Sequence, residues 1–343
     1  MKAIILAGGE GTRLRPLTYS VPKAMVPVLN RPFIEHVIRH LTSHGIKEIV
    51  LATGYKSDSI YEYFKNGTGT ELKLIYSLEE KPLGTAGAVR HAGKYLDGTF
   101  LVLNGDTYSD IDYTEMIQFH KTRGANATIA LTHVKDPTRF GVVETDGDGR
   151  IKAFIEKPTW DKVTSRWINA GVYILEPEVL NYIPKDRFCM FEHDVFPRML
   201  ADDKHVFAFA SKAYWIDMGT PENYHQLNRD LLMGKCKPIF PINDNIYMPA
   251  DSQIHPSVIR TGRIMLGHNC KIERGVELHG PVIIGRDCHI NQKAIIENSI
   301  LWDNIVVGQE ATIFNSIIAS GAKIEEKARL EREVLNYEVP GSL

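Results

Sequence analysis

The sequence has little of what marks secreted, metal-stapled or membrane-bound proteins. It contains only four cysteines, and no two of them form a C-x-x-C pair. This pattern argues against a disulfide framework or a zinc site and predicts reduced thiols. The apolar run at the N-terminus is far too short for the hydrophobic region of a signal peptide or for a bilayer span. We therefore expect a cytoplasmic protein without a membrane partner. The cysteines are Cys189, Cys236, Cys270 and Cys288.

Neither sign of charge is in excess, since 40 Lys and Arg residues stand against 42 Asp and Glu residues, for a net charge of −2. A diffuse surface for polyanions is therefore not expected, and nucleic acid is a poor candidate partner. Any phosphate site must be local. The 343 residues, 43% of them hydrophobic, are enough for two globular domains.

The N-terminal segment has the pattern of a phosphate-binding loop. Residues 1–7 form a continuous apolar stretch that predicts a buried parallel strand, and residues 8–18 form a glycine-rich turn. Glycines let backbone N–H groups approach phosphate oxygens, and Arg13 and Lys23 add positive charge. The turn lacks the last glycine of the dinucleotide fingerprint, and no P-loop motif is present. It therefore predicts a phosphate site of another kind.

Strand-like and helix-like segments alternate over residues 1–234, which predicts a doubly wound, mainly parallel α/β sheet of the Rossmann-like type. Ligands of such sheets lie at the carboxyl ends of the strands, where the glycine-rich turn and Asn104-Gly105-Asp106 are both expected. We expect this domain to end at residue 234 and a proline-containing linker to fill residues 235–252. The strand candidates are 49–53, 72–76 and 99–103, and the helix candidates are 33–44 and 85–95.

Residues 253–343 carry a six-residue period of aliphatic side chains. A period of six places one inward side chain on each short strand of a triangular coil, which predicts a left-handed parallel β-helix of hexapeptide repeats. Because a short solenoid must cover its ends, we expect the tail at 331–343 to pack on a neighbour or a second subunit, and the chain to form a homo-oligomer. The first run is Leu266, Ile272, Leu278, Ile284, Ile290 and Ile296; the second, after a phase slip, is Ile300, Val306, Thr312, Ile318, Ile324 and Leu330, with Thr312 as its polar exception.

Two aspartates stand where a divalent cation is expected. Asp106 follows an apolar strand, and Asp217 follows the short apolar stretch Trp215-Ile216 before a helix-start signal. Mg²⁺ prefers one or two carboxylates and takes its other ligands from substrate phosphates and water. Together with the glycine-rich turn, the two carboxylates predict a Mg²⁺ site for a nucleotide.

Further motifs contain groups suited to a phosphorylated sugar. In Glu156-Lys157-Pro158, Lys157 supplies a cation for a second phosphate, and Glu156 supplies an acceptor for hydroxyl groups. A surface ion pair before a proline turn is the plainer interpretation of that motif alone. The remaining candidates, at strand-like positions, are Gly141, Asn169 and Gly171.

In this order the segments resemble the pattern of the sugar-1-phosphate nucleotidyltransferases: G-G-x-G-T-R-L, L-G-T-A-x-A, G-D, E-K-P, N-A-G and W-x-D-x-G-T-P-E. Ala24 departs from the pattern, because proline commonly follows the lysine in that family. The resemblance implies roles for three sets of residues. Nucleotide binding is implied for Leu6, Ala7, Gly8, Gly9, Gly11, Thr12, Arg13, Glu79, Pro82, Gly84 and Asp106. Sugar-phosphate binding is implied for Gly141, Glu156, Lys157, Asn169 and Gly171. Catalytic roles are implied for Arg13 on the departing pyrophosphate, Lys23 on the bridging phosphate, and Asp106 and Asp217 on Mg²⁺.

The implied reaction needs no nucleophile from the protein. The sugar-phosphate oxygen is already an anion, and it attacks the α-phosphorus of a nucleoside triphosphate in line while pyrophosphate leaves. The task of the protein is to align two polyanions and to offset their repulsion with cations.

Glu79 lies in the stretch that resembles the base-reading loop of the family. Relatives that take uracil, thymine or adenine often have glutamine there. A carboxylate only accepts hydrogen bonds, which suits the adjacent N1–H and N2–H donors of guanine but not thymine. An unpaired buried polar group costs roughly 1–3 kcal/mol, enough for a tenfold preference. The sequence therefore favours GTP, unless Glu79 or Glu80 points to solvent.

For the sugar, the base-reading stretch, the E-K-P motif and the coil together resemble family members that use mannose 1-phosphate, with glucose and a manno-heptose left open. A thymidylyltransferase acting on glucose 1-phosphate is the alternative within the family. A nucleotide-sugar sensor without activity is the alternative of another class, although such proteins commonly lose the cations or carboxylates present here. An acyltransferase in the coil would use a histidine as a general base. The candidates for it are His255, His268, His279 and His289.

Overall fold

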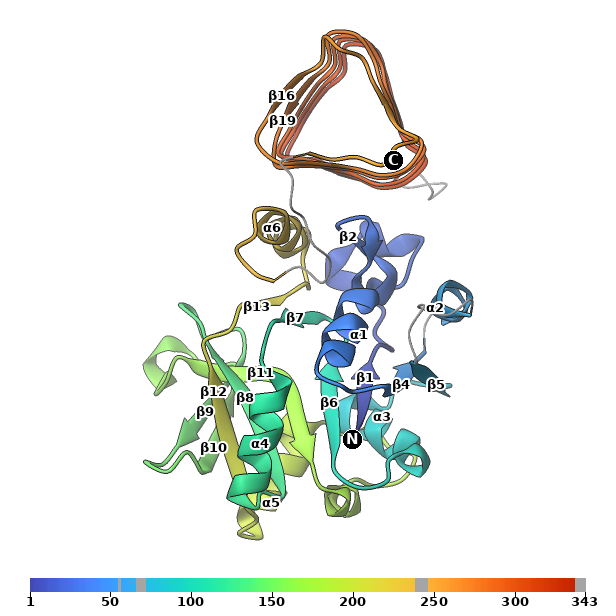
Figure 1. The fold of residues 1–343 in the computed structure, drawn as a ribbon. Helices are drawn as coiled ribbons and strands as arrows, with labels where there is room; N and C mark the ends of the chain where they lie inside the picture. Colours follow the sequence, from blue (N-terminus) through green and yellow to red (C-terminus); the bar gives the residue numbers. More distant parts are fainter. Residues whose placement is uncertain (55–56, 66–71, 238–245, 337–343) are drawn as a thin grey trace. The chain divides into compact units, whose positions relative to one another are not determined.

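The computed structural model describes residues 1–54, 57–65, 72–237 and 246–336. The chain divides into two compact units (Figure 1). The first contains Met1–Gly9 and Val37–Ile216, and the second contains Glu10–His36 and Asp217–Leu343. The glycine-rich turn is therefore shared: its first glycines belong to the first unit, and Arg13 and Lys23 belong to the second.

The first unit is built on a nine-stranded sheet with β1 near its centre. The apolar run at the N-terminus forms β1, which pairs in parallel with a strand on each side, and its core residues are fully buried, as expected of a parallel strand covered on both faces. The parallel strands are β1 (Lys2–Leu6), β4 (Glu48–Thr53), β5 (Lys73–Leu78) and β6 (Phe100–Asn104), in the order β6-β1-β4-β5. All three strand candidates of the sequence are confirmed within two residues.

Antiparallel pairs extend the sheet beyond β6. The strand β11 pairs with β6, β8 and β9, and β10 pairs with β9 as the edge hairpin. The sheet is thus mixed, and the expected doubly wound parallel arrangement describes its N-terminal half. The added strands are β8 (Ala127–His133), β9 (Gly141–Thr145), β10 (Ile151–Glu156), β11 (Trp167–Leu175) and β12 (Val206–Ser211). A separate two-stranded sheet pairs β7 (Thr107–Ser109) with β13 (Trp215–Asp217).

Helices pack on this sheet through apolar faces that follow the 3.6-residue period. Both ends of helix α4 are capped. The Asp112 side chain accepts a hydrogen bond from the Glu115 N–H at its start, and Gly124 ends the helix in the left-handed conformation. Both helix candidates are confirmed, the second as α3 followed by a 3₁₀ turn at Ala92–Tyr95. The helices are α1 (Phe33–Ser43), α2 (Asp58–Phe64), α3 (Gly84–His91), α4 (Tyr113–Arg123) and α5 (Phe196–Ala201).

The C-terminal part of the second unit is a three-sided parallel coil, drawn end-on as a triangle in Figure 1. Every strand pairs only with the strand one turn before and one turn after it, which is the arrangement of a parallel β-helix. The first face contains β14 (Ile246–Tyr247), β17 (Ile264–Leu266), β20 (Val282–Ile284), β23 (Ile300–Leu301), β26 (Ile317–Ile318) and β29 (Val334–Leu335). The second contains β15 (Gln253–Ile254), β18 (Lys271–Ile272), β21 (His289–Ile290), β24 (Val306–Val307) and β27 (Lys323–Ile324). The third contains β16 (Ile259–Thr261), β19 (Glu277–His279), β22 (Ile295–Glu297), β25 (Thr312–Phe314) and β28 (Arg329–Glu331).

The coil begins earlier than expected, because β14 pairs with β17 and lies inside the stretch assigned to a linker. Residues 238–245 of that stretch, and residues 337–343 of the expected tail, lie outside the described residues.

The first aliphatic run faces inward as expected, and all six of its members are buried. The second run is wrong in phase over its first half. Ile284 pairs with Leu301, Ile290 with Val307 and Ile296 with Ile313, so the inward residues are one position later than expected. Thr312 is therefore no exception to the pattern, because its neighbour Ile313 fills the core.

The phase error has a local cause. The corner between Leu278 and Ile284 contains the extra pair Gly280-Pro281, whereas the corner after Ile296 turns through one left-handed residue, Asn298, with φ 42°. The same shortened corner recurs at Asn315. Each later turn of the coil is thus one residue shorter than a strict period of six allows.

Other parts of the second unit pack on the first face of the coil. Its outward residues Met265, Ile283, Ile300 and Ile317 are all buried, unlike Val306 on the second face, which is 38% exposed. The helix α6 (Pro221–Leu232) and the segment 10–36 provide the partners: His225 bonds to the Asn298 carbonyl, and Arg263 to the Leu232 carbonyl. The segment 10–36 includes the 3₁₀ turns η1 (Thr12–Leu14), η2 (Leu17–Tyr19) and η3 (Lys23–Met25), and the hairpin β2 (Pro27–Val28) and β3 (Arg31–Pro32).

All four cysteines are free and buried, as predicted for reduced thiols. Cys270 and Cys288 occupy equivalent places on successive turns of the coil, and Trp302 is buried one turn later. The two cysteines belong to the hydrophobic core of the coil, whereas the Trp302 side chain bonds to Tyr224 of α6.

Candidate active site

The end of β1 and the end of β6 are tied together. The Gly105 N–H donates to the Leu6 carbonyl at 2.9 Å, and the Ala7 N–H donates to Ala52 at 2.8 Å. A Cβ atom at Gly105 would lie 2.4 Å from the Leu6 oxygen, so only glycine allows this approach. Asp106 is therefore held next to the start of the glycine-rich turn, where the sequence places it.

The Glu79 side chain points toward the glycine-rich turn. Its Oε1 lies 3.4 Å from the position a Cβ atom would take at Gly8, and its Oε2 accepts the Leu83 N–H at 3.2 Å. Burial raises the pKa of the Glu79 carboxyl above its ordinary value, against the Leu83 hydrogen bond and the nearby His91, which lower the pKa. Glu80 is exposed. Of the two glutamates, Glu79 is the one that the fold directs to the glycine-rich turn.

Gly84 begins α3 in the left-handed region, with φ 75°, under a crossing loop. A Cβ atom there would lie 2.6 Å from the Cys189 carbonyl, and that carbonyl accepts the N–H groups of Ala86 and Gly87. Gly84 is thus needed for close packing of backbone on backbone. Pro82, the other loop residue implied to bind nucleotide, is exposed.

Three of the expected sugar-site residues lie on one rung of the sheet. Glu156 pairs with Gly141 across β10 and β9, and Ile168 pairs with Val142, which sets Asn169 beside Gly141. A Cβ atom at Gly141 would lie 2.9 Å from Glu156 Oε2, so the carboxylate lies over the glycine. Lys157 is exposed and lies 3.4 Å from Glu156 Oε1 through its Nζ. The ion pair expected from the E-K-P motif therefore exists, and it lies on this rung.

Glu192 is a residue that the sequence interpretation missed. Its Oε1 accepts from the Tyr173 hydroxyl at 2.8 Å and from Asn169 Nδ2 at 3.3 Å. Asn169 Nδ2 also donates to the Tyr173 oxygen at 2.8 Å, and its Oδ1 accepts the Gly171 N–H at 2.9 Å. The Asn169 amide is thus engaged by the protein, and Glu192 adds a carboxylate beside Asn169. No recognised motif marks Phe191-Glu192-His193, so only the fold reveals it.

In the second unit, two cations converge on Asp217. Arg13 Nη1 lies 3.5 Å from Asp217 Oδ2, and Lys23 Nζ lies 3.8 Å from Asp217 Oδ1. The Lys23 side chain is only 10% exposed, whereas that of Arg13 is 64% exposed. Gly11, with φ 65°, allows this: a Cβ atom there would lie 2.9 Å from Lys23 Cβ. The structure therefore brings together three of the four residues expected to act in catalysis.

The backbone around Asp217 is fixed by the start of α6. The Asn223 Nδ2 donates to the Asp217 carbonyl at 2.7 Å, and the Thr220 side chain caps the helix by accepting the Asn223 N–H. Gly219 leaves room for the guanidinium, because a Cβ atom there would lie 3.0 Å from Arg13 Cζ. The G-T-P-E part of the motif thus builds the helix start that holds Asp217.

The donor chemistry fits a hard divalent cation. Across the part of the chain that the structure describes, no group of three or more His, Cys, Asp or Glu side chains is arranged to hold a metal. Asp106 in the first unit and Asp217 in the second each offer carboxylate oxygens, the ligand type of a cation that takes its remaining ligands from water and substrate phosphates. A soft-metal or zinc site is not supported by these donors.

The histidines of the coil bond to acidic or hydroxyl neighbours on its surface. His268 contacts Asp251 at 2.9 Å, His289 contacts Glu273 at 2.9 Å, and His279 contacts Glu277 at 3.0 Å. His255 bonds to Ser257 two residues on. These are local surface pairs.

Comparison with known families agrees with this architecture. The family described as "Nucleotidyl transferase" matches residues 2–234, and the one described as "EIF2B subunit epsilon LbH domain" matches residues 243–339. The chain belongs to the nucleotidyl transferase family, and its C-terminal coil is a left-handed β-helix.

Among curated relatives, the mannose-1-phosphate guanylyltransferase of Mycobacterium tuberculosis is 38% identical over 82% of this chain and 79% of its own length. The UTP–glucose-1-phosphate uridylyltransferase of a Synechocystis strain is 33% identical over 93% of this chain and 87% of its own length. The crystal structure of HddC from Yersinia pseudotuberculosis complexed with GMP-PN is 33% identical, with a TM-score of 0.59, and covers 67% of this chain and 99% of that chain.

Among the described residues, none of the helices combines the length and the apolar character needed to cross a bilayer.

Proposed function

We propose that this nucleotidyl transferase joins GTP to mannose 1-phosphate, giving GDP-mannose and pyrophosphate, with Mg²⁺ as cofactor. The observation that carries the choice of base is the Glu79 carboxylate, which faces Gly8 at the start of the phosphate turn. The relatives named as mannose-1-phosphate guanylyltransferases support the same pair of substrates.

The charge arrangement explains how the chain would promote the reaction. Arg13 is largely exposed and is proposed to bind the departing pyrophosphate, while the buried Lys23 stays near Asp217. Two cations next to one carboxylate leave net positive charge for phosphate oxygens. Mg²⁺ held by Asp106 and Asp217 would offset the charge of the triphosphate and orient it for in-line attack.

The sugar phosphate is proposed to bind over the rung of Gly141, Glu156 and Asn169. Lys157 is proposed to pair with the 1-phosphate, since its side chain is 67% exposed and its present ion pair with Glu156 is at the surface. The Glu156 and Glu192 carboxylates would accept hydrogen bonds from sugar hydroxyls. Burial raises the pKa of the Tyr173 hydroxyl well above its ordinary value, so the hydroxyl stays protonated and donates its hydrogen bond to Glu192.

A second candidate keeps the fold and changes the substrates. The Synechocystis relative is named for UTP and glucose 1-phosphate, and it matches nearly the whole chain. Glutamate in place of the family's common glutamine at position 79 favours GTP over this alternative.

The test is pyrophosphate release in the presence of Mg²⁺, with GTP, dTTP, UTP and ATP each paired with mannose 1-phosphate and glucose 1-phosphate. We expect turnover with GTP and mannose 1-phosphate, and loss of it in Asp106→Ala. The matched control is Asp148→Ala, which removes an exposed carboxylate from a surface turn. Preferred turnover with UTP or dTTP and glucose 1-phosphate would select the second candidate.

A further inference from the structure

The segment that carries Lys23 ends in a strained two-residue turn. Leu29 and Asn30 join β2 to β3, with φ angles of 48° and 59°. A leucine in the left-handed region is unfavourable, and such a residue persists only where its surroundings hold it. Leu29 is also completely buried. Something other than local preference must therefore fix this turn.

The helix α6 holds the turn from one side. The Leu29 N–H donates to Asn228 Oδ1 at 2.9 Å, and the Tyr224 hydroxyl donates to the Pro27 carbonyl at 2.6 Å. Asn228 Nδ2 is in turn bonded to the Tyr224 carbonyl at 3.0 Å. Tyr224 and Asn228 are both fully buried, so these bonds do not compete with water.

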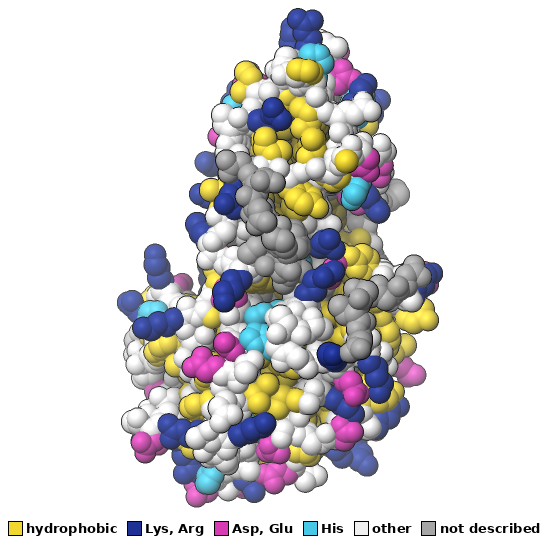
Figure 2. Space-filling view, in the orientation of Figure 1, with side chains coloured by type: hydrophobic (Ala, Val, Ile, Leu, Met, Phe, Trp, Pro, Cys, Tyr) yellow, Lys and Arg dark blue, Asp and Glu magenta, His cyan; other side chains and the backbone are white. Residues whose placement is uncertain are grey.

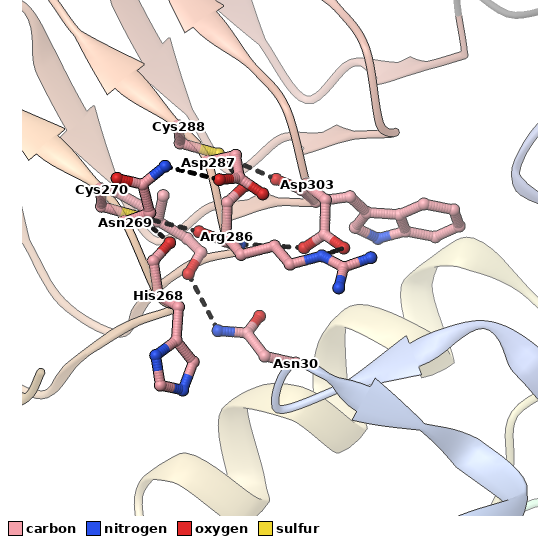
Figure 3. Close-up of polar contacts among 11 residues, drawn as sticks. Asn30, His268, Asn269, Cys270, Arg286, Asp287, Cys288 and Asp303 are labelled. Atoms are coloured by element: carbon pink, nitrogen blue, oxygen red, sulfur yellow. Dashed lines mark hydrogen bonds and ion pairs between the residues drawn. The ribbon is translucent and has the colours of Figure 1, made fainter. Parts of the chain in front are cut away.

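The β-helix holds the same turn from the other side. Trp302 Nε1 donates to the Tyr224 oxygen at 2.9 Å. Asn30 Nδ2 donates to the Ile284 carbonyl at 2.9 Å, and Figure 3 shows the Asn30 side chain directed at the coil. Because the indole N–H occupies an acceptor site of the hydroxyl, the single hydroxyl proton is directed at Pro27. Trp302, Tyr224 and Pro27 thus form a chain of hydrogen bonds from the coil to the segment that follows Lys23.

The same helix also holds the partner of Lys23. At its start, Asn223 binds the Asp217 carbonyl; one residue later, Tyr224 binds the segment that follows Lys23. Lys23 and Asp217 are therefore fixed relative to each other through α6, and α6 is fixed by the coil. The coil reaches the catalytic pair without contributing a side chain to it.

We propose that Trp302 and Tyr224 are positioning residues for nucleotidyl transfer, which set Lys23 against Asp217 through the Pro27 carbonyl. This inference rests on the proposed function for its kinetic consequence. It assigns to the β-helix a part in catalysis distinct from subunit assembly. It also explains why residues 10–36 form one compact unit with the coil.

The variants that test this are Trp302→Phe, Tyr224→Phe and the double variant. Trp302→Phe removes the N–H donor and keeps an aromatic ring, and Tyr224→Phe removes only the hydroxyl. The matched control is His225→Gln, since His225 joins α6 to the coil at the Asn298 carbonyl without touching the turn. Thermal unfolding is measured for each protein at the assay conditions.

We expect each single variant to lower kcat roughly tenfold, because one buried hydrogen bond that positions Lys23 is lost. The KM for sugar 1-phosphate should be unchanged. The double variant should lose no more than Tyr224→Phe alone, because both changes act on one hydroxyl. A kcat within twofold of wild type in Trp302→Phe, or independent losses that multiply in the double variant, would overturn the proposal.

Hydrogen exchange of residues 23–30 separates this proposal from the proposed function. Faster exchange there in Trp302→Phe and Tyr224→Phe, but not in His225→Gln, is expected whichever substrates the enzyme uses. Unchanged exchange refutes the positioning role even if the enzyme is active. If the wild type releases no pyrophosphate with any substrate pair, the proposed function fails, and the exchange result alone decides whether the coil holds the turn.

Discussion

Arg13 Nη1 lies 3.5 Å from Asp217 Oδ2, although 204 residues separate them in the sequence. This contact joins the phosphate turn at the start of the chain to the carboxylate at the start of α6. It shows how a cation from one motif and a carboxylate from another are brought together.

Replacing Asp217 with asparagine should abolish most activity. The change removes a carboxylate oxygen that is proposed to bind Mg²⁺, and it leaves Lys23, which is only 10% exposed, without that carboxylate. We expect kcat to fall at least roughly a hundredfold, with a higher Mg²⁺ concentration needed for half-maximal rate. Pyrophosphate release measured against Mg²⁺ concentration checks this. Retention of the wild-type rate at saturating Mg²⁺ would contradict a metal-binding role.

Replacing Glu79 with glutamine should change the base preference. The amide presents a donor as well as an acceptor, so one of the two guanine donors loses its partner while the thymine and uracil edges gain one. We expect the ratio of kcat/KM for GTP over dTTP to fall roughly tenfold or more. Glu80→Gln, at an exposed neighbour, is the control and should leave the ratio unchanged. An unchanged ratio in Glu79→Gln would move base recognition elsewhere.

The raised pKa of Glu79 predicts a pH dependence of GTP binding. Burial raises the pKa of this carboxyl, so its ionised, accepting form is present above the raised value and is lost as the pH falls through it. The KM for GTP should therefore rise on acidification at a higher pH than an ordinary glutamate would give. Kinetics from about pH 8 to about pH 5 test this. The Glu79→Gln protein should lack this rise.

The same shift has a consequence for stability. A carboxyl whose folded pKa is raised favours the folded state below its unfolded pKa, and this contribution is lost as the pH rises through the folded value. At neutral pH the ionised Glu79 therefore opposes folding of the free protein, and Glu79→Gln should be slightly more stable there. Denaturant unfolding at neutral and acidic pH measures this. The difference in free energy of unfolding between Glu79→Gln and the wild type should become smaller as the pH falls.

Gly105→Ala should damage both the fold and the site. The new Cβ would lie 2.4 Å from the Leu6 carbonyl oxygen, so β1 and the Asp106 loop must separate. We expect a loss of about 2 kcal/mol or more in the free energy of unfolding, together with reduced kcat. Gly147→Ala is the control, since a Cβ there meets no atom within 4 Å. Equal stability of the two variants would contradict the close approach.

Glu192→Gln should weaken sugar binding selectively. The Asn169 amide hydrogens are directed at Tyr173 and Glu192, which leaves the Glu192 carboxylate as an acceptor for hydroxyl groups. We expect the KM for sugar 1-phosphate to rise roughly tenfold, as for the loss of a charged hydrogen-bond partner, with the KM for GTP unchanged. Glu178→Gln, at an exposed carboxylate, serves as the control. A rise in the KM for GTP instead would place Glu192 at the nucleotide.

The parts of the fold that depend on local pattern were predictable. The apolar run of β1 and the turn from Gly8 to Arg13 are contiguous in sequence, and the inward positions from Leu266 to Ile296 follow a strict period. From Ile300 to Thr312 the prediction is wrong by one position, because a corner shortened at Asn298 moves the core by one residue. The predicted positions are inward again from Ile318 onward.

What depends on distant contacts could not be predicted in the same way. Glu192 belongs to no motif, and it becomes a candidate only when Tyr173 and Asn169 are brought against it. From the sequence, Trp302 is expected only to fill space in or beside the coil. Its hydrogen bond to Tyr224 depends on the packing of α6. The motif residues were easier to identify because their chemistry is visible in the residue types themselves.

The four apolar residues on the outer side of the first face, Met265, Ile283, Ile300 and Ile317, define a platform of four successive rungs. Because each rung of a solenoid touches only its neighbours, a rung that contacts nothing outside the coil can be added or removed as a whole module during evolution. Rungs within the platform have no such freedom, since losing one would shift the register of every docking residue beyond it. The next rung, β29, is followed by Asn336, whose Nδ2 donates to the Pro16 carbonyl at 2.9 Å. The length of the coil is thus fixed where α6 and segment 10–36 pack on it.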